Sequence, residues 1–152
     1  MHGATCLNEK NEVIRPCILW NDTRSHQECE EIMRDNSVKD IAGNIAMPGF
    51  TAPKVLWLKY NEPENFKSIN KVLLPKDFLR FYLTGDFYSD LSDASGTYWL
   101  DIAKREWSQK LLDAGSMQIS QMPKVCEGTD QTGTLKKEIA DKYGFSQNCK
   151  VY

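Results

Sequence analysis

Met47–Trp57 reads MPGFTAPKVLW, and this stretch decides more about the fold than any other part of the chain. The Pro48-Gly49 pair predicts a turn, and the hydroxyl of Thr51 just after it predicts the N-cap of a helix. Pro53 fits the first turn of that helix, where its missing N–H would have no partner in any case. The stretch therefore predicts a turn that leads directly into a helix.

The helix that starts in this stretch is expected to turn Val55 and Leu58 toward the core, because positions three residues apart lie on the same side of a helix, and Trp57 is a further candidate for the core. Glu62-Pro63 is expected to end it, since proline disfavours a helical residue before it.

Outside this helix, capping residues and hydrophobic periodicity predict a series of short elements. Residues 4–20 predict a β-hairpin whose second strand is weakened at Pro16. Ser25 and Glu28 have the spacing of a capping box. The other expected elements are a helix from Asp22 or Ser25 to about Arg34, a short helix at Val38–Ala42 that ends at Gly43, a helix at Pro63–Ile69, a strand at Lys71–Leu74, a helix from Pro75 closed by Gly85, a helix with Trp107, Leu111 and Leu112 closed by Gly115, and a helix with Leu135, Ile139 and Tyr143 closed by Gly144.

These elements make a mixed α/β protein that is rich in helices and has a small, incomplete sheet. A chain of 152 residues has the size of one domain and can bury a hydrophobic core. A hairpin and one short strand are marginal alone, so strands that should pair with them are expected to be missing. Exposed strand edges can pair with another chain, and a homo-oligomer through such edges is one expectation.

The composition argues against several classes of protein. A net charge of −2 gives no basic surface for nucleic acid or for a membrane. Five cysteines without a Cys-x-x-Cys pair, and only two histidines, predict reduced thiols and no disulfide framework or metal site. No apolar run reaches the roughly 18 residues of a membrane span, and no signal-peptide pattern is visible. These observations predict a cytoplasmic protein.

Two segments carry side chains suited to a polar ligand, and each also has a plainer structural interpretation. At Met1-His2-Gly3, a neutral imidazole can donate and accept hydrogen bonds, and the glycine would let a ligand approach the backbone. The alternative is a frayed terminus with an incidental histidine. Trp20 could stack on a sugar ring or pack in the core, Asp22 could cap a helix, and Arg24 could pair with a carboxylate.

Two further groups are interpreted as structural. A cluster of aspartates could bind Mg²⁺, but no glycine-rich loop with a following lysine accompanies it, so a solvated turn is favoured. Cys17 and Cys29 could be reactive thiols, but no histidine adjacent in sequence would activate them, and buried, inert thiols are expected. The aspartates are Asp86, Asp90, Asp93 and Asp101, around Ser95-Gly96-Thr97.

Six blocks that follow one another in order resemble the FGGY family of carbohydrate kinases, and most of all its branch that phosphorylates D-xylulose. They cover nearly the whole chain. The resemblance implies an actin-like (ribonuclease H-like) fold whose two domains close on the substrate. One departure is Tyr60, where the family signature carries a polar or charged residue. The blocks are Met1–Thr5, Arg15–Arg24, Met47–Trp57, Val72–Gly85, Ser89–Thr97 and Trp99–Trp107.

The reaction implied by the resemblance is phosphoryl transfer from ATP, with Mg²⁺, to D-xylulose, which gives D-xylulose 5-phosphate. Gluconate, ribulose and glycerol, which other members of the family use, are alternatives. The resemblance implies that Met1 and His2 touch the ketose and that Trp20 lies near the same pocket. Gly49-Phe50 takes the place of an aromatic substrate contact of glycerol kinases, which implies a roomier pocket.

The resemblance also implies a longer enzyme. The family begins with an Asp-x-Gly-Thr phosphate hairpin and carries its catalytic aspartate in a Gly-Gly-Gly-Asp-Asn segment, and this sequence contains neither. Residues 1–152 are expected to be part of a sugar-binding N-terminal domain that lacks the phosphate hairpin and the C-terminal nucleotide domain. We expect the catalytic aspartate beyond the C-terminus, no metal ligand, and no tight ATP binding. A complete, non-catalytic sugar-binding or interaction module is the alternative.

Overall fold

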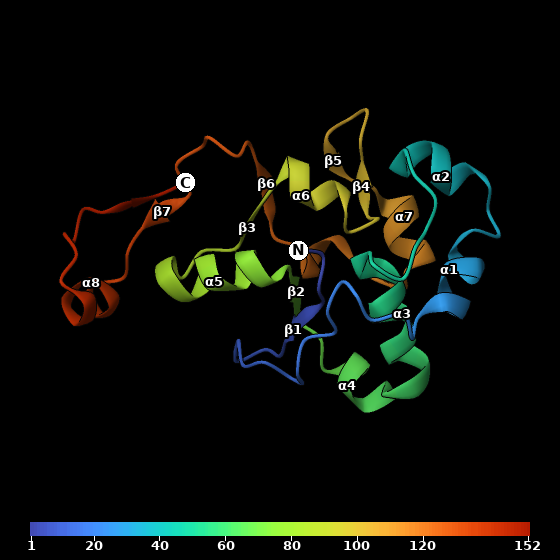
Figure 1. Cartoon of the computed structure of the whole chain (residues 1–152), viewed down its shortest axis with the longest axis horizontal. Helices are drawn as coiled ribbons and strands as arrows, with labels where there is room; N and C mark the ends of the chain where they lie inside the picture. Colours follow the sequence, from blue (N-terminus) through green and yellow to red (C-terminus); the bar gives the residue numbers. More distant parts are fainter.

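Short helices dominate the computed structural model, which describes residues 1–152 (Figure 1), and the predicted mixed, helix-rich architecture is confirmed. None of the helices is both long enough and apolar enough to cross a membrane. The helices are α1 (His26–Ile32), α2 (Ser37–Ala42), α3 (Thr51–Asn61), α4 (Pro63–Lys67), α5 (Pro75–Thr84), α6 (Leu91–Ser95), α7 (Gln109–Ala114) and α8 (Lys137–Tyr143), with a 3₁₀ turn η1 (Ile119–Gln121). The strands are β1 (Thr5–Leu7), β2 (Lys71–Leu73), β3 (Tyr88–Asp90), β4 (Leu100–Asp101), β5 (Glu106–Trp107), β6 (Lys124–Cys126), β7 (Gly133–Thr134) and β8 (Lys150–Val151).

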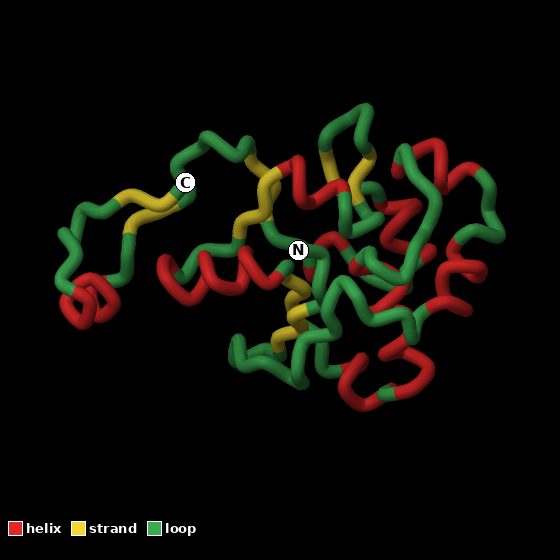
Figure 2. The backbone as a smooth tube through the Cα atoms, viewed as in Figure 1, coloured by secondary structure: helices red, strands yellow, loops and turns green.

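The strands pair only in twos, so the sheets are as small as predicted (Figure 2). β3 and β6 are parallel, whereas the pairs β1–β2, β4–β5 and β7–β8 are antiparallel. The hairpin predicted for residues 4–20 is wrong as a continuous element. Pro16 has no N–H to donate, and β1 makes its full ladder with β2 instead. The hairpin arms meet only at two isolated bridges, Ala4 to Ile18 and Leu7 to Val13.

The main hydrophobic core gathers around α3, which packs against α1 and α4. Val55 and Leu58 are buried as predicted, while Trp57 is only partly buried at the edge of this core. The helix ends before Glu62, also as predicted. The loop between α2 and α3, residues 43–50, packs Ala46 and Phe50 against this core and leads into the start of α3.

The C-terminal elements form a second, much smaller core. Leu135, Ile139 and Ala140 make this cluster, and Figure 1 shows α8 and β7 set apart from the main body. The link to the body is the end of α5, where the backbone N–H of Lys136 donates to the carbonyl oxygen of Leu83 at 2.8 Å. This unit lies away from the chain's N-terminus, where the candidate site is found.

Glycines end several helices, but they do so for different reasons. Gly43, Gly85 and Gly144 have φ angles of 67°, 90° and 72°, in the left-handed region that lets a helix stop. Gly115 after α7 has a φ of −90°, so the predicted left-handed stop is wrong there. A Cβ at Gly115 would lie 2.5 Å from Nε1 of Trp99, so this glycine makes room for the indole.

Two helix starts differ from the prediction because neither expected capping hydroxyl bonds to the first turn of its helix. Ser25 precedes α1, but its Oγ is buried without a hydrogen-bond partner, and the predicted capping box is wrong. The N-cap of α3 is Phe50 rather than Thr51. Thr51 is the first helical residue, and its Oγ1 donates to the carbonyl oxygen of His2 at 3.1 Å.

The helix predicted around Trp107 begins later than expected. Trp107 lies in β5, and its Nε1 donates to the carbonyl oxygen of Pro123 at 2.7 Å. α7 starts after Ser108, whose Oγ accepts a hydrogen bond from the N–H of Leu111. Trp107 is therefore a strand residue, and only Leu111 and Leu112, which follow it in the sequence, lie in the helix.

Candidate functional site

Met1, His2 and Trp20, the three residues proposed from the sequence as a binding site, line one pocket together. The pocket has a volume of about 510 Å³, and Gly49 and Phe50 complete its lining. Its surface is mainly apolar. Met1 and Trp20 are 72% and 64% exposed, so Trp20 does not pack in the core, and this alternative interpretation is wrong.

His2 is held in place by four neighbouring residues. Its backbone has a φ of 26°, and its carbonyl oxygen accepts the hydrogen bond from Thr51 at the start of α3. The ring lies directly over Gly96, where a Cβ would come within 2.1 Å of Nε2. Nε2 also contacts Oδ1 of Asp93 at 3.6 Å, and the ring meets Phe50 edge to face at 6.1 Å. The histidine is therefore an ordered part of the pocket and not a frayed terminus.

Burial favours the neutral imidazole at this position. It lowers the pKa of His2 below 6.5, and the positive N-terminal amino group and Lys54 act in the same direction. The carboxylate of Asp93 opposes the change, because it favours a proton on the ring. At neutral pH, His2 thus presents one N–H and one acceptor nitrogen, the combination that can serve a hydroxyl group.

Phe50 forms the pocket wall next to His2 and is supported from behind by a second aromatic ring. Phe50 stacks on Tyr98 with ring centroids 6.0 Å apart and an interplanar angle of 19°. Tyr98 is buried, has a φ of 70°, and donates its hydroxyl hydrogen to the carbonyl oxygen of Asn44 at 3.1 Å. Because the supporting ring is fixed, Phe50 presents a defined apolar face to the pocket.

Lys54 reaches the same wall from inside α3. Its Nζ donates to the carbonyl oxygens of Pro48, Gly49 and Phe50 at 2.6, 2.6 and 2.7 Å, and the side chain is completely buried. The sequence interpretation used this lysine only as part of a motif. A single charged residue among the buried positions of an otherwise apolar helical turn is the signal that could have identified it.

The acidic stretch is an ordered corner and not a solvated turn, so that prediction is wrong for Asp90 and Asp93. Nζ of Lys76 contacts Oδ1 of Asp77 and Oδ2 of Asp90 at 2.6 Å each, and Oδ2 of Asp93 at 3.6 Å. Oδ1 of Asp90 also accepts a hydrogen bond from the N–H of Asp93 at 2.9 Å, which caps α6. An ammonium thus occupies the centre of this cluster. Through Asp93 the cluster reaches His2.

Gly3 has a different role from the one the sequence suggested. It is buried, and a Cβ there would lie 2.8 Å from Sγ of Cys17 and 3.0 Å from Cγ of Pro75. Close packing, rather than the approach of a ligand, therefore requires glycine at this position.

Burial raises the pKa of Cys29 to about 11, so this thiol is not an activated nucleophile.

Asp22 and Arg24 form a local pair beside the pocket. Nε and Nη2 of Arg24 donate to the two carboxylate oxygens of Asp22 at 2.9 and 2.7 Å. The Arg24 guanidinium also lies 4.8 Å from the ring centroid of Trp57. The predicted pairing of Arg24 with a carboxylate is confirmed, whereas Asp22 does not cap α1, because Ser25 takes the N-cap position.

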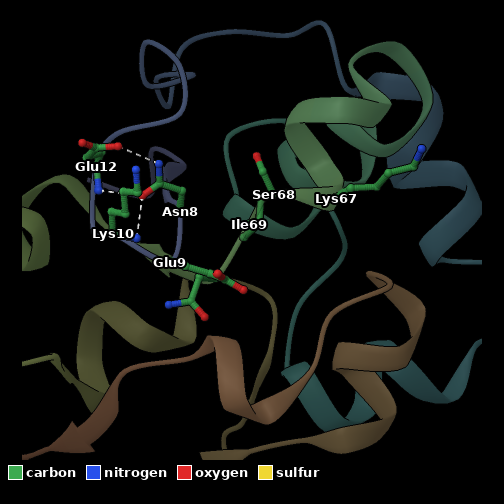
Figure 3. Close-up of a pocket in the computed structure, with 8 residues that line it drawn as sticks. Asn8, Glu9, Lys10, Glu12, Lys67, Ser68 and Ile69 are labelled. Atoms are coloured by element: carbon green, nitrogen blue, oxygen red, sulfur yellow. Dashed lines mark hydrogen bonds between the residues drawn. The ribbon is translucent and has the colours of Figure 1, made fainter.

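A second hollow lies at the far end of β1 from His2 (Figure 3). It has a volume of about 320 Å³ between the turn at residues 8–12 and the segment at residues 67–70. Oδ1 of Asn8 already accepts hydrogen bonds from the N–H groups of Lys10 and Glu12, and its Nδ2 donates to Oε2 of Glu12. These groups stabilise their own turn, which leaves the pocket at His2 as the better candidate.

Comparisons with known proteins point to one family. The sequence profile of the FGGY family of carbohydrate kinases, N-terminal domain, matches residues 1–152. A xylulose kinase of Escherichia coli (strain K12) is 52% identical over 147 residues, which are 96% of this chain and 30% of that protein. The chain therefore spans about a third of the length of the curated relatives it matches.

Solved structures agree with the sequence comparison. The crystal structure of a xyloylose kinase from Brucella ovis shares 48% identity and superimposes with a TM-score of 0.96 over 99% of this chain and 31% of that chain. The crystal structure of a gluconate kinase from Lactobacillus acidophilus shares 27% identity with a TM-score of 0.91, again over 99% of this chain and 31% of that chain.

Proposed function

Because the chain belongs to the FGGY family of carbohydrate kinases, we propose that it forms the sugar-binding part of a kinase for D-xylulose. The actin-like fold predicted from the resemblance is that of its structural neighbours and is confirmed. The proposed reaction transfers a phosphoryl group from ATP to D-xylulose and yields D-xylulose 5-phosphate.

The pocket that brings Met1, His2 and Trp20 together is the observation that supports this proposal most directly. A ketose needs both an apolar surface for its carbon skeleton and a hydrogen-bonding group for its hydroxyls. The exposed indole of Trp20 and the fixed ring of Phe50 supply the first, and the neutral imidazole of His2 supplies the second.

We assign His2 the role of a substrate-binding group. In this proposal, its Nε2–H faces Asp93, and Nδ1 accepts a hydrogen bond from a sugar hydroxyl. Trp20 would stack against the sugar, and Met1 would contact it at the exposed edge of the pocket. No residue of this chain is proposed as the catalytic base.

The residues of this chain do not fit Mg²⁺ or the phosphates of ATP. No group of three or more histidine, cysteine or acidic side chains is arranged to hold a metal ion, and the Lys76 ammonium fills the acidic corner. We therefore propose that other parts of a longer polypeptide bind the nucleotide, consistent with the much greater length of the relatives. The chain itself contributes binding and orientation of the sugar.

The test is a sugar-dependent ADP-release assay on the longer polypeptide, with D-xylulose, D-ribulose, D-gluconate and glycerol compared. D-Xylulose should give the highest kcat/KM. His2→Ala should raise KM for D-xylulose about tenfold or more while KM for ATP stays the same, because only the sugar loses a hydrogen bond. His26→Ala is the matched control, since His26 is the other histidine and lies exposed on α1.

Two results would contradict the proposal. If His2→Ala changed KM for D-xylulose and KM for ATP equally, His2 would not be a sugar-binding residue. A higher kcat/KM with D-gluconate would instead favour the substrate named for the Lactobacillus acidophilus neighbour, which is the second candidate.

A further inference from the structure

Lys54 is a completely buried ammonium group whose three hydrogen bonds all go to one turn. Its Nζ lies 2.6 to 2.7 Å from the carbonyl oxygens of three successive residues, Pro48, Gly49 and Phe50. An ammonium has three N–H donors, and all three are used here. The lysine therefore holds three consecutive peptide groups around a single atom.

Burying the Lys54 ammonium costs free energy, which argues that its charge has a role in the structure. Removing an ammonium from water costs several kcal/mol, and a hydrophobic side chain of similar volume would avoid this cost. The titratable groups that face Lys54 are Asp22, Cys17, Cys29 and His2. Asp22 makes its close contacts with Arg24, so backbone carbonyls, and not a carboxylate, solvate the Lys54 ammonium.

The turn that Lys54 holds is the turn that forms the pocket. Gly49 and Phe50 line it, and a Cβ on Gly49 would lie 3.3 Å from the carbonyl oxygen of Trp20. The position of this turn therefore determines where Phe50 lies against His2 and where Gly49 lies against the backbone of Trp20. Lys54 itself does not line the pocket.

We propose that Lys54 is a positioning residue for the sugar pocket, because its ammonium fixes the Pro48–Phe50 turn and through it the separation of the walls at Phe50, His2 and Trp20. The identity of the ligand in this proposal rests on the proposed function, but the link between Lys54 and the turn does not.

The ionisation of Lys54 should affect the Pro48–Phe50 turn. Burial lowers the pKa of Lys54 to about 8, although Asp22, Cys17 and Cys29 act to raise it. A neutral amine has two N–H donors and a lone pair, and the lone pair would face one of the three carbonyl oxygens. The turn should therefore loosen as the pH rises through about 8.

The first experiment follows the backbone amides of Gly49 and Phe50 by NMR in the 152-residue chain between pH 6.5 and 9.5. Both resonances should titrate together with a midpoint near pH 8, the value for Lys54. Lys54→Arg, which keeps a permanent cation, should abolish this titration. Lys59→Met is the matched control, because Lys59 lies on the same helix and donates to Oγ of Ser116, away from the pocket.

The second experiment measures kinetics of the longer polypeptide. Lys54→Met should raise KM for D-xylulose about tenfold and change kcat less than twofold, since it alters binding geometry and not the phosphoryl transfer itself. In the wild-type protein, KM for D-xylulose should rise above pH 8, and this rise should be absent in Lys54→Arg.

The outcomes separate this proposal from the proposed function. If the Gly49 and Phe50 amides do not respond to the ionisation of Lys54 in the wild-type chain, the proposal is wrong, whether or not the variants fold. If they do respond but D-xylulose is not a substrate, the role of Lys54 in the turn stands and the proposed function fails. An equal loss of kcat and of sugar affinity in Lys54→Met would also overturn the positioning role.

Discussion

At the scale of single residues, the position of His2 depends on a glycine that is distant in sequence. Gly96 has a φ of −77°, which any residue adopts, so only space requires glycine there. A methyl group at Gly96 would lie 2.1 Å from Nε2 of His2, and the imidazole would have to move. The histidine and the glycine therefore act as one unit, although 93 positions of sequence lie between them.

Gly96→Ala should raise KM for D-xylulose about tenfold, because the displaced imidazole loses its hydrogen bond to the sugar. KM for ATP should not change, and the melting temperature should fall only slightly because the backbone is not strained. Gly128→Ala is the control, since a Cβ at Gly128 meets nothing within 4 Å. An unchanged KM for the sugar in Gly96→Ala would show that the ring position does not matter for binding.

The ionisation of His2 should limit sugar binding at acid pH. Burial lowers the pKa of His2 below its usual 6.5, so the native chain holds this proton less tightly than the unfolded chain. As the pH falls from 6.5 through the lowered pKa, the unfolded state takes up the proton first, and stability decreases. In the same interval the protonated ring loses its acceptor nitrogen, and KM for D-xylulose should rise.

Asp93→Asn should shift this acid limb to lower pH, because the carboxylate is the main group that raises the pKa of His2. It should also increase KM for the sugar at pH 7.5, since the contact that orients the ring is weakened. Asp86→Asn is the control from the same acidic stretch, as Asp86 lies outside the Lys76 cluster. An acid limb that moves to higher pH would contradict the role of Asp93.

At the scale of secondary structure elements, local patterns predict helices well and their partners poorly. The turn at Pro48-Gly49, the body of α3 and its end before Glu62 follow from residues within a few positions of one another. Thr51 fails as a cap because its hydroxyl bonds to His2, 49 residues earlier. A pattern of neighbouring residues cannot predict a contact between positions so far apart in the sequence.

The hairpin of residues 4–20 and the acidic corner also depend on partners that are distant in the sequence. Thr5 pairs with Leu73 in β2, and a partner so far along the chain is not visible in the pattern of residues 4–20. Asp90 and Asp93 look like a solvated turn until Lys76 is placed beside them. The family resemblance, and not the residue pattern alone, predicted that Met1, His2 and Trp20 share a pocket. Lys54, Asp93 and Gly96, which hold the pocket residues in place, became evident only from the packing.

Lys76→Met should destabilise the chain by roughly 2 kcal/mol, because it leaves the carboxylates of Asp77 and Asp90 without their ammonium partner. Asp77 is 1% exposed, so its charge cannot be solvated by water instead. Urea denaturation at pH 7 measures the change. Lys104→Met, which removes an exposed lysine 3.6 Å from Asp101, should have little effect. Equal stability of the two variants would show that the corner is not held by Lys76.

At the scale of the whole molecule, the candidate site is open on one side. Met1 and Trp20 are both mainly exposed, so a sugar bound between Trp20, Phe50 and His2 would keep one face in water. Phosphoryl transfer requires the reacting groups to be positioned and their developing charge to be stabilised, and a closed site that excludes water helps both. Under the proposed function, this pocket therefore binds and orients the sugar, and the other requirements of phosphoryl transfer fall to other parts of a longer polypeptide.

The isolated 152-residue chain should accordingly show no ATP-dependent phosphorylation of any ketose. A coupled ADP-release assay checks this, and ADP release above background that depends on D-xylulose would contradict it. Calorimetry with D-xylulose then separates the two remaining possibilities. Clear binding by the isolated chain would favour a sugar-binding module that functions alone. If the isolated chain does not bind the sugar, while a longer polypeptide with an upstream Asp-x-Gly-Thr and a downstream Gly-Gly-Asp-Asn does, the pocket depends on the parts that would close it, as the exposure of Met1 and Trp20 leads us to expect.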